Sequence, residues 1–235
     1  MNIVEDILTG LKGELEMVDT STLFTDATLI LNISNAHLWA GDQHDWPQLE
    51  KAKRSFTTDI NGIVDEYYDY PSEFKSDSIH QLEINGVTYF LKSWDSYKIV
   101  KREGSLPADL NIFATFGRQF FLNRVPSASG LPIDAWGQIQ APPLNNLTDK
   151  TIFSDSEASL NEAIMRKALA TSLASAGNKE EGIREQARAT IILASGFKKI
   201  LDRRQRAQEM SMPRFNVPDM FSNSRVQFAP GNIQR

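Results

Sequence analysis

Three histidines, His37, His44 and His80, are the side chains best suited to metal binding or proton transfer near neutral pH. His44 is followed by Asp45 and lies close in sequence to Asp42, so an acid–base or metal cluster is conceivable there. Such sites need partners at a recurring spacing, whereas His37 and His44 are seven residues apart across a predicted helix end. Ordinary surface or turn roles are therefore our prediction for the histidines.

A group of acidic side chains, Asp65, Glu66 and Asp69, surrounds two tyrosines and superficially suggests a glycosidase. Glycosidases hold two carboxyl groups about 5–10 Å apart across a cleft, which neighbours in one strand or turn do not provide. The sequence also lacks a Gly-x-Ser-x-Gly elbow, a phosphate-binding loop and a dinucleotide fingerprint. We therefore expect a solvated acidic loop, and a protein that is not an enzyme and has no cofactor or metal.

The composition, 41% hydrophobic and 23% charged over 235 residues, is typical of a soluble globular protein. No apolar run approaches the ~20 residues of a membrane-spanning helix, and the first residues do not match a signal peptide. Because the chain has no cysteine, disulfides, zinc-thiolate sites and thiol nucleophiles are excluded. These features predict synthesis inside a cell and no membrane partner.

Charge is distributed unevenly along the chain. The formal net charge of −5 and a pI near 5.3 argue against general coating of nucleic acid. Residues 1–70 carry 13 Asp/Glu and 4 Lys/Arg, a charge of −9, whereas residues 198–235 carry 8 Lys/Arg and 3 Asp/Glu, a charge of +5. This asymmetry suits head-to-tail or ring association, in which a basic end meets an acidic partner surface. Two independently solvated faces are the alternative interpretation.

Helical periodicity occurs at both ends of the chain. Residues 2–17 predict a short amphipathic helix, and a second helix is expected between residues 22 and 41. Ser154 and Glu157 match a capping box for a third helix, which ends near Gly177. The last helix is predicted to start at Glu180 and to pair with the third as an antiparallel hairpin. The apolar stripes expected in the second and last helices are Leu23, Ala27, Ile30, Leu31, Ser34 and Leu38, and Ile183, Ala187, Thr190, Ile191, Ala194, Phe197 and Leu201.

Between these helices the periodicity changes to alternation. Asn85-Gly86 separates two alternating segments and is the strongest hairpin signal, because both residues accept positive φ. Asn61-Gly62 is a second candidate turn, and Gly117-Arg118 is expected to join two strands. Further short strands are predicted at residues 96–102, 111–116, 119–125 and 135–140. Such a set favours a small antiparallel sandwich or barrel.

The predicted fold class is therefore α+β. Helices at residues 1–54 and a helix hairpin at residues 151–209 would form one bundle, into which a small antiparallel β-sandwich or barrel at residues 55–150 is inserted. Residues 210–235 contain too many breakers and too few apolar residues for a core, and we expect an extended tail that binds a partner.

Two further groups of residues suggest binding. Aromatic residues gather in the middle of the chain and would permit a stacking platform for sugars or single-stranded nucleic acid, although alternation makes most of them core. The members are Trp94, Tyr97, Phe113, Phe116, Phe120, Phe121 and Trp136. Five basic residues within nine exceed what a helix C-terminus needs and suggest a role toward DNA or an acidic partner. They are Lys198, Lys199, Arg203, Arg204 and Arg206.

Four segments follow one another in an informative order. They are Asn32-x-x-x-Ala36 with Trp46-Pro47-Gln48-Leu49; residues 67–74, Tyr-Tyr-Asp-Tyr-Pro-Ser-Glu-Phe; residues 120–126, Phe-Phe-Leu-Asn-Arg-Val-Pro, with Pro142-Pro143-Leu144; and residues 165–177 followed by 187–201. In this order, over about residues 20–210, the chain resembles the head-to-tail connector (adaptor) proteins of tailed bacteriophages, which form the ring beneath the portal.

The resemblance implies a structural virion protein of the neck that is not an enzyme and is assembled in the host cytoplasm. Members assemble, typically as dodecamers, on the portal protein after DNA packaging, continue the DNA channel, and seat the tail or stopper (tail-completion or nozzle) proteins. Their C-terminal segment commonly reaches the portal. In this chain the resemblance implies that the portal-binding residues are Pro213, Arg214, Phe215, Val217, Pro218, Met220, Phe221, Val226 and Phe228. The basic residues from Lys198 to Arg206 would face the channel or portal, with transient, non-specific DNA contacts.

The alternative function is an aromatic-platform β module of a virion or tail component that binds carbohydrate or another ligand. It would act as a monomer, whereas the adaptor would form rings with the portal.

Overall fold

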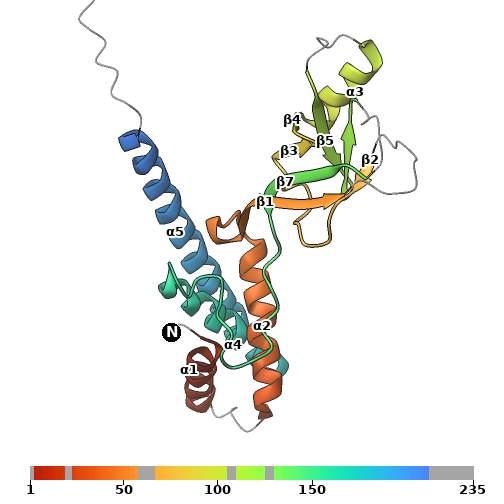
Figure 1. Ribbon diagram of the computed structural model, residues 1–235. Helices are drawn as coiled ribbons and strands as arrows, with labels where there is room; N and C mark the ends of the chain where they lie inside the picture. Colours follow the sequence, from red (N-terminus) through yellow and green to blue (C-terminus); the bar gives the residue numbers. More distant parts are fainter. Residues whose placement is uncertain (1–2, 19–22, 58–66, 105–109, 125–129, 212–235) are drawn as a thin grey trace, which may run out of the picture. The chain divides into compact units, whose positions relative to one another are not determined.

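The computed structural model describes residues 3–18, 23–57, 67–104, 110–124 and 130–211 (Figure 1). The fold is α+β, and the chain divides into two compact units, Met1–Phe197 and Lys198–Arg235. The described part of the first unit contains helices α1 to α4, the first part of α5, and a sheet whose strands come between α2 and α4 in the sequence (Figure 1). The four-part division at residues 54, 150 and 209 remains a prediction.

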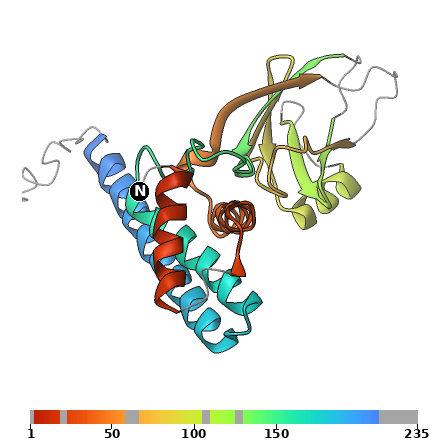
Figure 2. The same ribbon diagram turned by 90° about the horizontal axis from the view of Figure 1, so that it is seen from below.

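Three helices of the first unit pack against one another in pairs. They are α1 (Val4–Met17), α2 (Asp26–Asp42) and α4 (Asn161–Ser175), and Figure 2 looks along α2. The predicted α1 is confirmed, because its periodic residues Ile7, Leu8, Leu11 and Leu15 are all buried. The second helix begins later than predicted, at Asp26, where the hydroxyl of Thr25 accepts a hydrogen bond from the Thr28 amide.

The final helix, α5 (Lys179–Ser211), packs on α4 through small residues. A Cβ atom added at Gly182 would lie 2.9 Å from the Ala170 carbonyl oxygen of α4, and one at Gly196 would clash with the Leu160 side chain just before α4. The residues of α5 that are buried share one face: Gly182, Glu185, Ala189, Leu193, Gly196 and Ile200. The predicted core face of this helix is therefore wrong, since Ile183, Ile191 and Leu201 are exposed.

The stripe predicted for α2 is wrong in part, because Leu23, Ala27 and Leu31 are exposed, whereas Ser34 is buried as predicted. The buried side of this helix includes Leu29, Ile33, Ala36, His37 and Ala40, together with polar Asn32 and Ser34. Both polar side chains have partners: Asn32 donates to the Ser172 hydroxyl at 3.0 Å, and the Ser34 hydroxyl accepts from the Leu144 amide at 3.0 Å.

The sheet has the strand order β1-β7-β3-β4-β5-β6-β2 and is curled (Figure 1). The strands are β1 (Glu50–Thr57), β2 (Tyr67–Asp69), β3 (Gln81–Ile84), β4 (Val87–Leu91), β5 (Ile112–Phe116), β6 (Gln119–Leu122) and β7 (Pro132–Gln138). The predicted turns at Asn85-Gly86 and Gly117-Arg118 are confirmed, with positive φ at all four residues. The turn predicted at Asn61-Gly62 lies outside the described residues.

One sheet connection differs from the prediction. Residues 96–102 form most of a helix, α3 (Trp94–Glu103), rather than a strand. The Ser93 hydroxyl caps its start by accepting from the Ser96 amide, and Gly104 ends it at φ +62°. Since a helix between β4 and β5 returns the chain to the same end of the sheet, these strands pair in parallel, and the fully antiparallel prediction is wrong.

The core of the β region lies mainly on one face of the sheet. It contains Tyr70, Phe74, Ile79, Leu82, Ile84, Tyr89, Phe113, Phe120, Leu122, Ile133 and Ala135. On the other face Tyr97 of α3 packs with Ile112 and Ala114, and its hydroxyl donates to the Leu122 carbonyl at 2.9 Å. Alternating residues of the strands therefore supply two separate clusters.

The segment that returns from β7 to α4 is held against α1 and α2. The amides of Val4 and Glu5 donate to the carbonyls of Asp149 and Leu147, and His37 Nε2 accepts from the Ile152 amide at 3.0 Å. The capping box predicted at Ser154 and Glu157 does not open the helix, because α4 begins at Asn161 and Leu160 occupies its N-cap position. The chain then passes through a 3-10 turn, η3 (Ala158–Leu160), before α4 begins.

Buried His37 makes the stability of the fold depend on pH. Burial lowers its pKa from 6.5 to about 4, and a weaker backbone interaction with Pro142 opposes the shift in part. Since the unfolded chain binds this proton more readily, the stabilisation is complete above pH 6.5 and is lost as pH falls toward 4, by on the order of 3 kcal/mol.

Chemical denaturation at pH 7 and at pH 4.5 measures how much the free energy of unfolding falls between these pH values. This fall should be smaller for His37→Gln than for the control His80→Gln, in which an exposed histidine is replaced. Equal falls in the two variants would show that His37 is not the source of the pH dependence.

The close approach of α4 and α5 predicts opposite effects for two glycine substitutions. Gly182→Ala should lower the free energy of unfolding by about 1–3 kcal/mol, because the new methyl group meets the backbone of α4. Gly13→Ala in α1 should raise it by about 0.5–1 kcal/mol, because nothing lies within 4 Å of the added atom. Thermal melts of both variants test the contact. A neutral or stabilising Gly182→Ala would show that the helices are not packed this closely.

Candidate interaction surfaces

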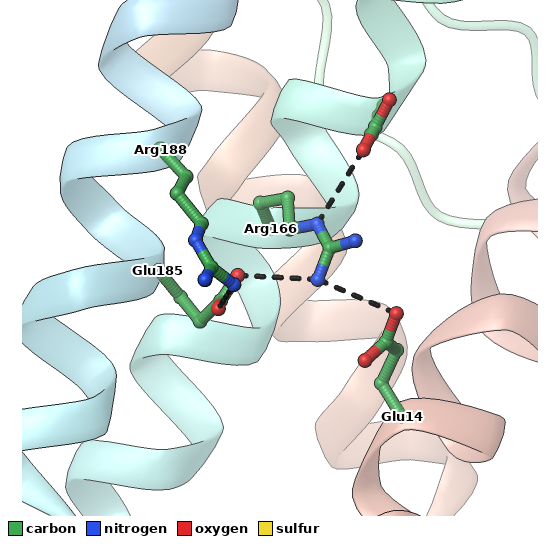
Figure 3. A network of polar contacts seen from close by, with 5 residues as sticks. Glu14, Arg166, Glu185 and Arg188 are labelled. Carbon is green, nitrogen blue, oxygen red and sulfur yellow. Dashed lines mark hydrogen bonds and ion pairs between the residues drawn. The ribbon is translucent and has the colours of Figure 1, made fainter.

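A charged cluster fastens α5 to α1 and α4 (Figure 3). One guanidinium nitrogen of Arg166 lies 3.3 Å from Glu14 of α1 and 3.2 Å from Glu185 of α5, and Nε lies 3.5 Å from Glu162. Arg188 contacts the second oxygen of Glu185. The Glu185 side chain is only 7% exposed, so its charge is compensated by two arginines rather than by water.

A second contact joins the same helices next to this cluster. Lys167 of α4 donates to the side-chain oxygen of Gln186 on α5 at 3.1 Å. Its ammonium also lies 5.3 Å from the ring centre of Trp39 on α2. Together these contacts set the rotation of α5 about its own axis, and therefore decide which of its residues face outward.

The predicted basic residues all lie on the later part of α5. Lys198, Lys199, Arg203, Arg204 and Arg206 are all exposed, while Asp202 among them is half-buried. They belong to the second compact unit, Lys198–Arg235. The predicted portal-binding residues, Pro213 to Phe228, lie outside the described residues. The structure therefore brings the basic residues onto one helix and leaves their role a prediction.

Apolar side chains are also exposed on α2, at Leu23 just before it, and on the first part of α5. Ile183 is 71% and Ile191 68% exposed, and Ala187 between them is exposed too. Leu23 is 63% and Leu31 58% exposed, with exposed Ala27 between them. The sequence predicted these residues to be core. Periodicity therefore identified apolar faces of the helices, but these faces are exposed rather than packed inside the bundle.

A polar cleft of about 640 Å³ lies beside the C-terminus of α2 and is lined by residues 42–45, 75–78, Arg118, Gln140 and Phe197. Lys75 donates from Nζ to the carbonyls of Gly41 and His44 at 2.6 and 3.0 Å, which satisfies backbone oxygens at the helix end. Burial lowers the pKa of Lys75, and nearby Asp45 and Asp42 oppose that shift. This lysine is thus engaged in holding the helix terminus.

The histidines are not gathered into one site. His37 is buried, which corrects the surface role predicted for it. His44 stacks on Phe197 with ring centres 4.3 Å apart, and burial followed by the charge of Lys75 lowers its pKa. His80 lies 4.0 Å from Glu50 at the sheet edge. Within the described residues, no group of three or more His, Asp or Glu side chains is placed to hold a metal ion.

The aromatic residues expected to form a platform are divided between core and surface. Phe113 and Phe120 are fully buried in the sheet core. Trp94 stacks with both Tyr97 and Phe116, at ring-centre distances of 5.6 and 5.0 Å. Phe116 is 56% exposed. Stacking within the cluster covers ring surface that a sugar would need, and Trp94, Phe121 and Trp136 are only half-buried.

Comparison with models of known protein families finds no match, and comparison with curated proteins finds none either. Among the described residues, no helix has the length and apolar character needed to cross a membrane.

The charged cluster predicts a specific double-mutant result. Arg166→Met leaves buried Glu185 with one arginine and should lower the free energy of unfolding by about 2–4 kcal/mol. Adding Glu185→Leu removes the uncompensated charge and should restore much of that loss, which urea denaturation will measure. Strictly additive losses from the two substitutions would show that Arg166 and Glu185 do not interact.

Proposed function

We propose that this protein is a structural head–tail adaptor of a tailed-bacteriophage virion, which forms a homo-oligomeric ring on the portal protein and is not an enzyme. The observation that carries the proposal is the design of α5. Its first part is fastened to α4 and α1 by Arg166 and Glu185, and its later part, which belongs to the second compact unit, carries five exposed basic residues. A helix with these two parts suits a protein that also binds a partner.

In this proposal α1, α2, α4 and the first part of α5 form the bundle of the adaptor, and the sheet is its inserted β domain. The insertion is compatible with an undisturbed bundle because both connections are tied to α2. On the outgoing side the Trp46 indole nitrogen donates to the Ala40 carbonyl, and on the returning side Ser34 and His37 accept amide hydrogens. The sheet would contact the tail or stopper proteins below.

The basic residues of α5 would face the channel or the portal. Five exposed cations on one helix attract phosphate without the groove-reading side chains of a specific DNA-binding protein. Copies arranged in a ring, typically twelve, would give the channel a mild positive wall along which packaged DNA slides with transient contacts. The protein would then belong to the virion neck, after assembly in the host cytoplasm.

Residues 213–228 would dock on the portal as an extended strand, with aromatic and aliphatic side chains as anchors. Ordering one short segment costs entropy, so a single copy binds weakly. Twelve copies on one ring engage together, and simultaneous binding makes release slow.

The experiment compares the full chain with a chain truncated after Glu209 for binding to purified portal rings. The truncated protein should keep its melting temperature, because the described core lies before the deletion, and should lose ring binding measured by sedimentation. The triple variant Phe215→Ala, Phe221→Ala, Phe228→Ala should bind at least about tenfold more weakly. The matched control Asn216→Ala, Ser222→Ala, Gln227→Ala should bind normally.

Equal binding by the truncated and full chains would refute the docking role of the tail. A full chain that stays monomeric, does not bind portal rings and binds glycans would instead support the aromatic-platform alternative.

A further inference from the structure

Two apolar patches remain on the surface of the first compact unit. We define the α2 patch as Leu23, Ala27 and Leu31, and the α5 patch as Ile183, Ala187 and Ile191; all six residues are exposed. Ala27 and Leu31 are one helical turn apart on α2, and successive members of the α5 patch are one turn apart on α5, so each helix presents its members on one face. Leu23 lies three residues before α2 begins. Both helices therefore have a second apolar side in addition to the side that enters the core.

The two patches cannot cover each other within one copy. α2 contacts α4 through Asn32, which reaches Ser172, whereas α5 contacts α4 through Gly182, which packs on Ala170 and Ala174. In Figure 2, which looks along α2, α4 lies between α2 and the first part of α5. Surfaces that flank a shared helix on different sides are available for contact with different neighbours.

The α5 patch also has a shape that accepts protruding side chains. A groove of about 520 Å³ lies between α4 and α5 and is lined by Ala170, Ala174, Gly182 and Ile183, among others. Small residues at 170, 174 and 182 leave this groove open beside Ile183. Leu31 of another copy has the size and chemistry to enter it as a knob.

Charge favours the same pairing. The described parts of α1 and α2 carry Glu5, Asp6, Glu14, Glu16, Asp26 and Asp42 against the single cation Lys12. The surface beside the α5 patch is close to neutral, because Lys179, Arg184 and Arg188 are exposed there together with Glu180 and Glu181. Two copies of the acidic helix pair would repel each other, whereas this repulsion is absent when the α2 patch meets the α5 patch.

We propose that the α2 patch of one copy packs against the α5 patch of the next, so that copies of this chain associate head to tail. Such a contact is heterologous and repeats around a closed ring, and in that respect the inference rests on the proposed adaptor function. Patches of three residues bury little area, so one contact is weak and the ring forms at high concentration or on a portal template.

The test uses two variants that each damage one side of the contact, Leu31→Glu and Ile191→Glu. Both side chains are more than half exposed, so the variants should fold and melt like the wild type. In analytical ultracentrifugation each variant alone should self-associate at least about tenfold more weakly than the wild type. Ile99→Glu on α3, an exposed isoleucine outside both patches, is the matched control and should self-associate normally.

Mixing the two variants gives the decisive result. The intact α2 patch of Ile191→Glu can bind the intact α5 patch of Leu31→Glu, so a 1:1 mixture should form dimers and nothing larger. A mixture that stays monomeric, or a Leu31→Glu variant with normal association, would overturn the pairing. The mixed dimer should also form when both chains are truncated after Glu209. Its loss would overturn the pairing, because the contact would then depend on the residues after Glu209.

Portal rings separate this inference from the proposed function. If both variants bind portal rings in the same number and as tightly as the wild type, the contact is wrong and the adaptor function stands. If the mixed dimer forms but the wild-type chain does not bind portal rings, the contact stands and the adaptor function fails.

Discussion

The contact between α4 and α5 is the constraint on which the other surfaces depend. Gly182 lets the two helices approach until the backbones nearly touch, Gly196 makes room for Leu160 just before α4, and the ion cluster around Arg166 sets the rotation of α5. Each feature needs the other. Without glycine, Glu185 and Arg166 would be held farther apart, and without the arginine a buried carboxylate would disfavour the close approach. The outward direction of Ile183 and Ile191 follows from this geometry.

Polar groups, rather than apolar area alone, position the inserted sheet. The chain leaves α2 at a terminus whose carbonyls accept from Lys75, and it returns along α2 through Ser34 and His37. Because each buried partner must be satisfied, these hydrogen bonds specify one path for the connecting segments. Neutral His37 is part of this arrangement, and its low pKa is the electrostatic consequence of a burial that serves architecture.

In the proposed adaptor role, each of these surfaces has a different use. Helix faces buried in one copy hold the fold, exposed apolar faces of α2 and α5 are available to neighbouring copies, and the basic part of α5 is available to phosphate or an acidic partner. Weak individual contacts are an advantage for a ring that must assemble at the right time. A template that presents many sites at once converts them into a stable assembly.

The sequence by itself determined the α+β class, helix α1 and the hairpin at Asn85-Gly86, because these depend on local periodicity and on residues that accept positive φ. It also located the apolar faces of α2 and α5. Only the tertiary structure decided which face each helix buries, because Gly182, Glu185, Asn32 and His37 enter the core through partners distant in the sequence. Helix α3 was missed because alternation at residues 96–102 outweighed its caps, Ser93 and Gly104, and its burial under the parallel pair β4–β5 is a long-range effect.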